Sequence, residues 1–312
     1  MRRNHFDSRL SGLLIVDKPK GPTSFDIVWK IRKALRVKKV GHTGTLDPMA
    51  TGVLILCVNR ATKLVPFLQA GDKVYEGRMV LGLSTDTDDI TGRVSAKRTV
   101  TGIGREDIER AASEFIGTIE QVPSSYAALK YNGQPGYKLA RRGEKVPPRA
   151  RRVVVHELTV NEVNLPKVSF MARVSKGTYI RSLAADWGWR LGPGACLESL
   201  RRLANASFSV DQAVSLEEAL NLAADGRLQE RLIPVEEALS FMPAVEVDRK
   251  LAALVENGQP IPLSHLKRTG PPVGPVRVMA PESGLLAVYE CHSPMLGNSE
   301  EFLTPLRVLT GQ

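Results

Sequence analysis

The chain is organised around residues 41–54, which read Gly41-His42-Thr43-Gly44-Thr45-Leu46-Asp47-Pro48-Met49-Ala50-Thr51-Gly52-Val53-Leu54. Pro48 biases Asp47 toward extended backbone, because a proline disfavours helical dihedrals in the residue before it. Gly44 and Gly52 allow other backbone to approach closely on either side. The apolar run at 54–58 is typical of a strand buried on both faces. The pattern predicts a glycine-punctuated loop that presents one carboxylate just before a buried strand.

The spacing alone leaves two interpretations of this carboxylate open. A loop over 41–52 on a rigid scaffold would hold the Asp47 side chain in a fixed orientation, which is what a nucleophile needs. An Asp-Pro turn capped by its own hydroxyl groups explains the same residues without any chemistry. A single carboxylate without a partner also argues against an ordinary glycosidase, which uses two.

Hydrophobic patterning on either side of this loop predicts a mixture of helices and strands. One helix is indicated after Thr23 or Ser24 by four apolar residues at helical spacing, Ile27, Val28, Ile31 and Leu35. Further helices are expected over 105–116 and 179–191, and strands over 12–17, 73–82, 152–163 and 167–175. Past Pro243, short apolar runs alternate with glycine and proline, which indicates a small β-rich module. We expect a main domain over 1–241 and a C-terminal module over 242–312.

The charge of the chain favours a polyanionic partner. Its 312 residues carry a formal net charge of +10. The segment 124–152 has a single acid, Glu144, and eight basic residues: Lys130, Lys138, Arg141, Arg142, Lys145, Arg149, Arg151 and Arg152. Three interleaved tyrosines offer stacking faces to unpaired bases. A solvated charged loop is the alternative, and the lack of balancing acids favours RNA binding over it.

Other classes of function have little support in the sequence. No run of eighteen uncharged apolar residues is present, so no membrane span is expected. Cys57, Cys196 and Cys291 are far apart among apolar residues, which predicts buried free thiols and neither a disulfide framework nor a zinc site. The acidic turn over 86–92 resembles a calcium loop but has Ile90 at the fifth ligand position. We expect a cytoplasmic protein without a metal or a cofactor.

Residues 41–54 closely resemble the catalytic motif of the TruB-type tRNA pseudouridine synthases, which form pseudouridine at position 55 of the T loop. Further segments resemble that family in the same order: Lys18-Pro19-Lys20-Gly21-Pro22-Thr23-Ser24, then Tyr75, then Ser175-Lys176-Gly177-Thr178-Tyr179-Ile180-Arg181-Ser182-Leu183, and then Leu200-Arg201-Arg202-Leu203. The resemblance spans roughly residues 11–241. It implies an α+β fold with a mixed, largely antiparallel sheet, and the C-terminal module loosely resembles a PUA-type RNA-binding domain.

The resemblance also implies catalytic roles. Asp47 is the essential carboxylate, and Arg181 pairs with it and keeps it ionised. Tyr75 stacks on the extruded uracil and is a candidate to remove the proton from C5. Read without the resemblance, Tyr75 would be a half-buried core aromatic and Arg181 a solvated helix residue. Three courses stay open for Asp47: addition to uracil C6, attack on ribose C1′, or action as a base toward the sugar.

The remaining residues carried over from the family bind the substrate. His42 fills the stack vacated by the flipped base, and Tyr179 and Leu200 line the dry pocket around it. Lys18 and Pro19 belong to the N-terminal motif. Lys130, Arg141 and Arg142 lie in the basic segment over 124–152, which in the family is an insertion that grips the T stem-loop. Here Ser124 and Ala127 depart from the family pattern, which leaves the individual contacts of this segment open.

The function implied is isomerisation of uridine 55 in tRNA, with base flipping and without an obligate protein partner. Two alternatives remain. The basic segment and the C-terminal module would also suit an RNA-binding or tRNA-folding protein with minor catalysis. A guide-RNA-dependent pseudouridine synthase would share the same catalytic domain.

Overall fold

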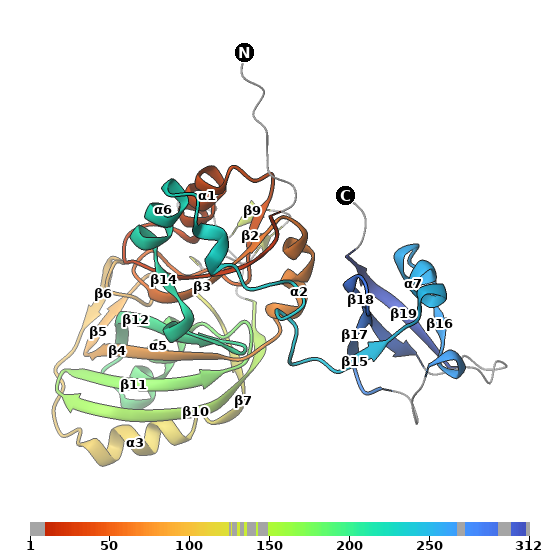
Figure 1. Ribbon diagram of the computed structural model, residues 1–312. Coiled ribbons are helices and arrows are strands. Elements are labelled where there is room, and N and C mark those ends of the chain that lie inside the picture. The colour runs from red at the N-terminus through yellow and green to blue at the C-terminus, as the bar shows by residue number, and fades with distance from the viewer. Residues whose placement is uncertain are drawn as a thin grey trace.

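The computed structural model describes residues 10–124, 126, 130–131, 134–135, 142, 149–266, 272–292 and 301–309. Figure 1 shows one large sheet with helices around it, followed by a smaller sheet that forms a separate body at the C-terminal end. This arrangement confirms the predicted α+β fold with a β-rich C-terminal module. The boundary that we predicted between residues 241 and 242 remains a prediction.

The large sheet has ten strands, eight of them in the order β14-β1-β3-β12-β4-β11-β10-β7, with β2 beside β3 and β13 beside β12. Among the described strands of this sheet, only the β1–β14 and β3–β12 pairs are parallel, so the sheet is mixed and largely antiparallel. Its strands are β1 Gly12–Lys18, β2 Val40–His42, β3 Thr51–Val58, β4 Lys73–Leu81, β7 Gly117–Gln121, β10 Arg151–Asn164, β11 Lys167–Val174, β12 Ala195–Asn205, β13 Phe208–Ser209 and β14 Val214–Ser215.

Helices cover the large sheet at both ends. In Figure 1, α1 and α6 lie together at one end of the sheet and α3 lies at the other. The helices are α1 Ser24–Leu35, α2 Val65–Leu68, α3 Arg105–Ser113, α5 Ile180–Leu191, α6 Leu216–Ala224 and α7 Arg249–Glu256. Short 3-10 turns are η1 Asn59–Leu64, η2 Val210–Gln212, η3 Leu228–Arg231 and η4 Leu263–His265. Small two-stranded pairs are β5 Leu83–Thr85 with β6 Val94–Lys97, and β8 Lys130–Tyr131 with β9 Gln134–Pro135.

Local sequence accounts for where α1 begins. Thr23 is the N-cap residue, and its hydroxyl accepts a hydrogen bond from Asp26 N at 3.1 Å. The Asp26 carboxylate in turn accepts from Thr23 N at 2.8 Å, which completes a capping box. Ile27 and Ile31 are fully buried on the inner face. The predicted helix after Thr23 is therefore confirmed.

Strand β3 is buried on both faces, as its continuous apolar run predicts. Leu54 and Leu56 pack with α1 and α6, whereas Val53, Ile55 and Cys57 face the opposite cluster. That second cluster includes Leu285, Val288 and Leu309 from the C-terminal part of the chain. Burial on both sides makes β3 a rigid support for the segment that precedes it.

The smaller sheet has the order β15-β17-β18-β19-β16 and is covered by α7. Its strands are β15 Ala244–Glu246, β16 Ile261–Pro262, β17 Pro275–Ala280, β18 Gly284–His292 and β19 Phe302–Val308. The Arg60 side chain of η1 donates a hydrogen bond to the carbonyl of Leu285 in β18, which ties this sheet to the large one.

The four predicted strands differ from the observed ones by one residue at one or both ends, and three other predicted boundaries need correction. The loop over 41–52 is shorter than predicted, because β2 takes its first two residues and β3 its last two. The helix over 179–191 begins at Ile180, with Tyr179 as its extended N-cap residue. The helix predicted over 105–116 ends at Ser113. Of the cysteines, Cys57 and Cys196 are buried free thiols as predicted, but Cys291 is only half-buried.

Candidate active site

A cavity of about 650 Å³ opens beside the loop between β2 and β3. The loop contributes residues 43–47 to its wall, and β4 contributes Tyr75. The N-terminal end of α5 contributes its N-cap residue Tyr179 and Arg181, and β12 contributes Leu200. The fold thus gathers five residues singled out in the sequence, Asp47, Tyr75, Tyr179, Arg181 and Leu200, around one space. The volume lies in the range of ordinary ligand sites.

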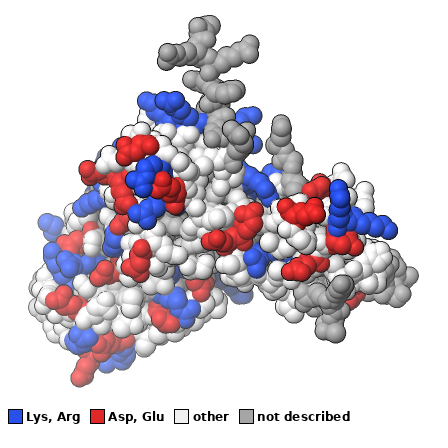
Figure 2. Space-filling view, in the orientation of Figure 1, with Lys and Arg blue, Asp and Glu red and all other residues white. Residues whose placement is uncertain are grey.

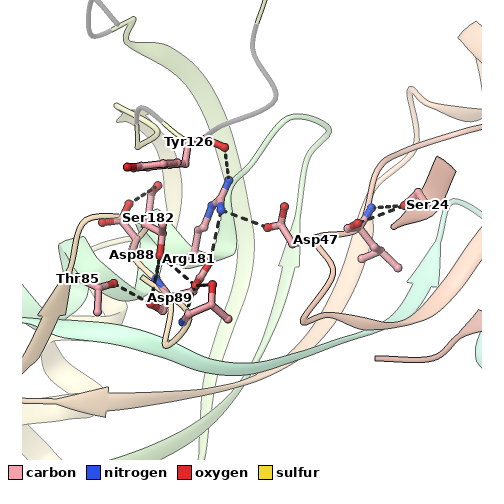
Figure 3. Close-up of polar contacts among 11 residues, drawn as sticks. Ser24, Asp47, Thr85, Asp88, Asp89, Tyr126, Arg181 and Ser182 are labelled. Carbon is pink, nitrogen blue, oxygen red and sulfur yellow. Dashed lines mark hydrogen bonds and ion pairs between the residues drawn. The ribbon is translucent and has the colours of Figure 1, made fainter. Parts of the chain in front are cut away.

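Two side chains from the N-terminal motif hold the Asp47 loop from behind. The Ser24 hydroxyl accepts from Leu46 N at 2.9 Å and lies 3.2 Å from Leu46 O (Figure 3). The Lys18 ammonium is buried and donates to the carbonyls of Pro48 at 3.4 Å and Ala50 at 2.8 Å. These contacts fix the backbone on both sides of Asp47, which gives the carboxylate a defined orientation.

Asp47 and Arg181 form an ion pair across the cavity wall. Asp47 Oδ2 lies 3.6 Å from Arg181 Nη1 (Figure 3). The Asp47 side chain is 39% exposed, whereas that of Arg181 is 8% exposed. At 3.6 Å the contact is too long for a hydrogen bond and is not a bidentate fork. Asp47 therefore has a cation opposite it and still presents its carboxylate to the cavity.

Asp89 is a second acid beside Arg181, and our sequence reasoning gave it no role. Its Oδ2 lies 3.4 Å from Arg181 Nη1, and its side chain is 5% exposed. Arg181 Nη2 also donates to the carbonyl of Tyr126 at 3.4 Å. Figure 3 shows the Arg181 guanidinium with its three partners, Asp47, Asp89 and Tyr126. Next to them, Asp88 is hydrogen-bonded to Ser182. The one signal in the sequence was the acidic turn over 86–92 itself.

The turn holds Asp89 in place by hydrogen bonds of its own. Asp89 Oδ1 accepts from Thr91 N at 2.9 Å and from the Thr87 hydroxyl at 3.0 Å. Asp88, just before it, adopts a left-handed backbone with φ 62°. Burial raises the pKa of the Asp88 carboxyl above its ordinary value, and the hydrogen bond from Ser182 opposes that rise. The hydrogen bonds to its Oδ1 therefore fix Asp89 as a buried partner of Arg181.

We expect Asp89→Ala to lower the free energy of unfolding by about 3 kcal/mol, because it leaves the Arg181 cation buried with its remaining acid partner 3.6 Å away. Urea denaturation measures this change. Asp86→Ala in the same turn is the matched control, since Asp86 is exposed and accepts hydrogen bonds from Arg93 N and the Tyr126 hydroxyl but forms no ion pair among the described residues. Equal losses in the two variants would remove the special weight given to the Asp89–Arg181 pair.

Tyr75 and Tyr179 contribute two aromatic rings to the cavity. Tyr75 in β4 is 8% exposed and packs in the core cluster beneath the site. Tyr179 is held through its backbone, because the buried Gln121 amide donates to its carbonyl at 3.0 Å and accepts from its N–H at 2.8 Å. Its ring centroid lies 5.9 Å from the guanidinium of Arg151 and 5.8 Å from that of Arg181. Both rings are placed to contact a flat base.

Other sequence candidates lie outside this wall. Lys18 and Pro19 line a separate depression next to β14, so the structure gives Lys18 the task of holding the loop and no place in the cavity. His42 ends β2, and its Nδ1 accepts from Gly44 N at 3.2 Å. Burial lowers the pKa of the His42 imidazole, with a smaller contribution from Arg202. It stands one residue before the part of the loop that lines the cavity.

The basic segment over 124–152 lies largely outside the described residues. Arg141 is among those not described, and of Lys130 only the backbone in β8 is described. Arg142 is exposed. Their predicted contacts with the T stem-loop stay predictions.

The wall of the cavity is strongly basic. Asp47 is the only carboxylate among the described lining residues, and the cations there are Lys73, Arg151, Arg152, Lys176, Arg181 and Arg202. Burial lowers the pKa of Lys73 to about 8, and the charge of Arg202 contributes to the shift. On the face shown in Figure 2, by contrast, blue and red side chains are interspersed. The wall is thus suited to an anionic ligand such as an RNA backbone.

The described residues contain neither a candidate metal site nor a candidate membrane-spanning helix. No group of three histidine, cysteine or acidic side chains there could hold a metal ion. No helix in that part of the chain is long and apolar enough to cross a membrane.

Comparisons with known proteins agree with this geometry. Residues 32–180 match the family model described as TruB family pseudouridylate synthase (N terminal domain), and residues 181–240 match that described as tRNA pseudouridylate synthase B C-terminal domain. The chain is 39% identical to tRNA pseudouridine synthase B of Geobacter sulfurreducens over 302 residues, 96% of this chain and 99% of that protein. It is 41% identical to that of Geobacillus thermodenitrificans over 307 residues, 96% and 99% of the two chains.

Among solved structures, the fold is similar to that in a Cbf5-Nop10-Gar1 complex, with a TM-score of 0.76 and 25% identity over 99% of this chain and 88% of that one. It is also similar to a chain in an H/ACA RNP bound to a substrate RNA containing 2′-deoxyuridine, with a TM-score of 0.73 and 25% identity over 96% and 85%. The predicted resemblance is confirmed: the chain belongs to the TruB family of pseudouridylate synthases.

Proposed function

We propose that this tRNA pseudouridine synthase converts uridine 55 of the T loop to pseudouridine with Asp47 as its essential carboxylate. The observation that carries the assignment is the placement of Asp47, 3.6 Å from the buried cation of Arg181 and on the wall of one cavity with Tyr75 and Tyr179. The relatives at 39% and 41% identity are named for the same reaction class.

The reaction needs few groups, and the cavity supplies them. The C1′–N1 bond of uridine breaks, the uracil turns, and C5 joins C1′ in its place. The proton on C5 is then removed and N1 gains one, so the product is an isomer of the substrate. Each of the three courses open to Asp47 needs its ionised carboxylate, and Arg181 supplies the counter-charge. Tyr75 and Tyr179 supply faces on which the free uracil stacks, and Tyr75 is the candidate that removes the C5 proton.

The target uridine must leave its loop before it reaches Asp47. Extrusion costs a few kcal/mol of lost stacking. We assign His42 to the vacated stack, because it stands directly before the loop residues that line the cavity. Phosphates beside the extruded base would meet the cations of the wall, among them Arg151 and Lys176.

Tritium release tests this function. A T-arm stem-loop labelled at C5 of uridine 55 is incubated with the purified protein, and a second stem-loop carries the label at a uridine of the stem. We expect release from the first RNA alone. Binding of both RNAs without release from either would point to an RNA-binding role with minor catalysis.

We further propose that the enzyme needs neither a guide RNA nor a partner protein and that it works in the cytoplasm, where tRNA is modified. Identity is 39% and 41% to the tRNA enzymes and 25% to the H/ACA chains, which supports direct action on tRNA. Turnover of bare tRNA by the purified chain is expected. A requirement for added guide RNA would overturn this part of the proposal.

Arg151 offers a test of the basic wall. We expect Arg151→Ala to weaken tRNA binding and to lower the slope of log Kd against log salt by about one unit, because one phosphate contact is lost. Binding titrations at several salt concentrations measure the slope. Arg105→Ala on α3 is the control, since that exposed residue pairs with Glu109 and does not line the cavity. An unchanged slope in Arg151→Ala would place the phosphate contacts elsewhere.

A further inference from the structure

Arg202 is a buried arginine on the wall of the active-site cavity, and it has no role in the chemistry proposed for Asp47, Tyr75 and Arg181. It belongs to β12, which runs between β3 and β4. In the sheet register Arg202 is opposite Tyr75 on one side and Gly52 on the other. The residue therefore joins the strand that carries the active-site tyrosine to the strand that supports the Asp47 loop.

The guanidinium of Arg202 ties together the two ends of that loop. Its Nε donates to the carbonyl of Val53 at 2.7 Å, and its Nη2 donates to the carbonyl of Gly44 at 3.1 Å. The residue as a whole is 1% exposed. Gly52 has φ +102°, and a Cβ there would lie 2.1 Å from the Arg202 carbonyl oxygen, so only glycine lets the two strands approach this closely.

The third nitrogen of Arg202 has a different environment. Nη1 has no hydrogen-bond partner among the described residues. Unlike Nε of Arg181, it is not one of the side-chain atoms there that are fully buried and lack a partner. Arg202 lines the cavity. A Cβ on Gly44, which lines the same cavity, would lie 3.5 Å from Nη1. Two nitrogens therefore hold the loop, while the third has no partner among the described residues and lies next to a residue of the cavity wall.

The charge of Arg202 is also uncompensated. No carboxylate in the described part of the chain forms an ion pair with it, whereas Arg181 has two. Arg202 adds to the positive charge around two lysines, since it contributes to lowering the pKa of both Lys18 and Lys73. A buried charge without a counter-charge is costly to keep. An anion that forms only when substrate is bound would provide the missing counter-charge.

We propose that Arg202 is a catalytic residue whose Nη1 donates a hydrogen bond to a carbonyl oxygen of the detached uracil, so that its charge stabilises the uracil anion. When the C1′–N1 bond breaks, its electron pair leaves with the base and spreads over the base's oxygens. The pair is returned when C5 bonds to C1′, and the C5 proton is then lost while N1 is protonated. Arg202 exchanges neither proton nor electron and acts by a preorganised charge. Such electrostatic stabilisation of the transition state is usually the largest single contribution to catalysis.

This inference rests on the proposed function, and its test is a comparison of variants by single-turnover tritium release at saturating enzyme. We expect Arg202→Gln to lower the rate constant about a hundredfold with the Kd for tRNA little changed, because one donor to a developing anion is lost. Arg202→Lys keeps a charge and is expected to lose only about tenfold. Arg201→Lys, whose residue pairs with Asp17 outside the cavity, is the matched control and is expected to react as wild type.

A role limited to holding the loop would give a different result. A lysine ammonium and a glutamine amide can both donate to a loop carbonyl, so Arg202→Lys and Arg202→Gln would then lose activity to a similar extent. Similar losses in the two variants, or an unchanged rate constant in both folded variants, would overturn the proposal. If wild type itself released no tritium, the proposed function would fail, and Arg202 would not be the cause.

Gly44→Ala provides a variant that leaves Arg202 in place. Its added methyl group meets only Nη1, at ordinary contact distance, and the backbone there needs no left-handed conformation. We expect Gly44→Ala to lower the rate constant about tenfold in the wild-type background and to have no further effect in Arg202→Gln, since both changes remove the same donor. Losses that add in the double variant would show that Nη1 is not the group involved.

Discussion

Asp47→Asn is expected to lower tritium release from the labelled T-arm by more than about a thousandfold while tRNA binding is retained. The amide is nearly the same size as the carboxylate, so the loop held by Ser24 and Lys18 should keep its shape. It carries no negative charge, however, and all three courses open to Asp47 need one. Single-turnover release and a binding titration on the same RNA separate the two effects.

Asp225→Asn is the control for this change. Asp225 is exposed at the end of α6 and does not line the cavity, so its neutralisation should leave release unchanged. Release from Asp47→Asn at even a tenth of the wild-type rate would mean that another group carries out the chemistry. Tight binding without release would show that substrate recognition does not depend on the carboxylate.

Arg181→Lys is expected to have the second-largest effect, a loss of about a thousandfold in the single-turnover rate constant. The guanidinium contacts three groups at once, the carboxylates of Asp47 and Asp89 and the carbonyl of Tyr126 (Figure 3). An ammonium is a compact charge without a planar fork and cannot serve all three at these positions. Because Asp89 is buried, we expect the lysine to stay with it and to leave Asp47 without its counter-charge.

The matched control lies nine residues further along the chain. Arg190, also in α5, is exposed and pairs with Glu114 at the surface, so Arg190→Lys should leave turnover unchanged. Thermal unfolding of both variants checks that a loss of activity is not a loss of fold. Turnover of Arg181→Lys comparable to wild type would remove the ion pair from the mechanism.

Much of the fold was predictable because its signals are local. The apolar run after Asp47 predicts a strand buried on both faces, and β3 is such a strand. Thr23 and the spacing of Ile27 and Ile31 predict α1 and its start. The ends of the 41–52 loop were predicted less well, because hydrogen-bond partners that glycine and threonine do not reveal come from the pairing of β2 with β3 at one end and of β3 with β1 and β12 at the other.

The resemblance named residues from four separate segments without placing them. Asp47, Tyr75, Tyr179 and Leu200 meet in one cavity because β4 and β12 are neighbours and α5 begins beside them. The same resemblance grouped Lys18 with the substrate-binding residues. In the folded chain its ammonium is buried against carbonyls of the loop, since β1 ends behind that loop.

The chain's own pattern was thus enough to identify the family, the strand that supports Asp47 and the residues that match the catalytic motif. It was not enough to find Asp89 or Arg202, which look like an ordinary turn acid and an ordinary strand arginine. Asp89 stands 92 positions from Arg181, and Arg202 stands 158 positions from Gly44. Their importance comes from burial and from the charges placed opposite them, and both are created only when distant strands pair and exclude water.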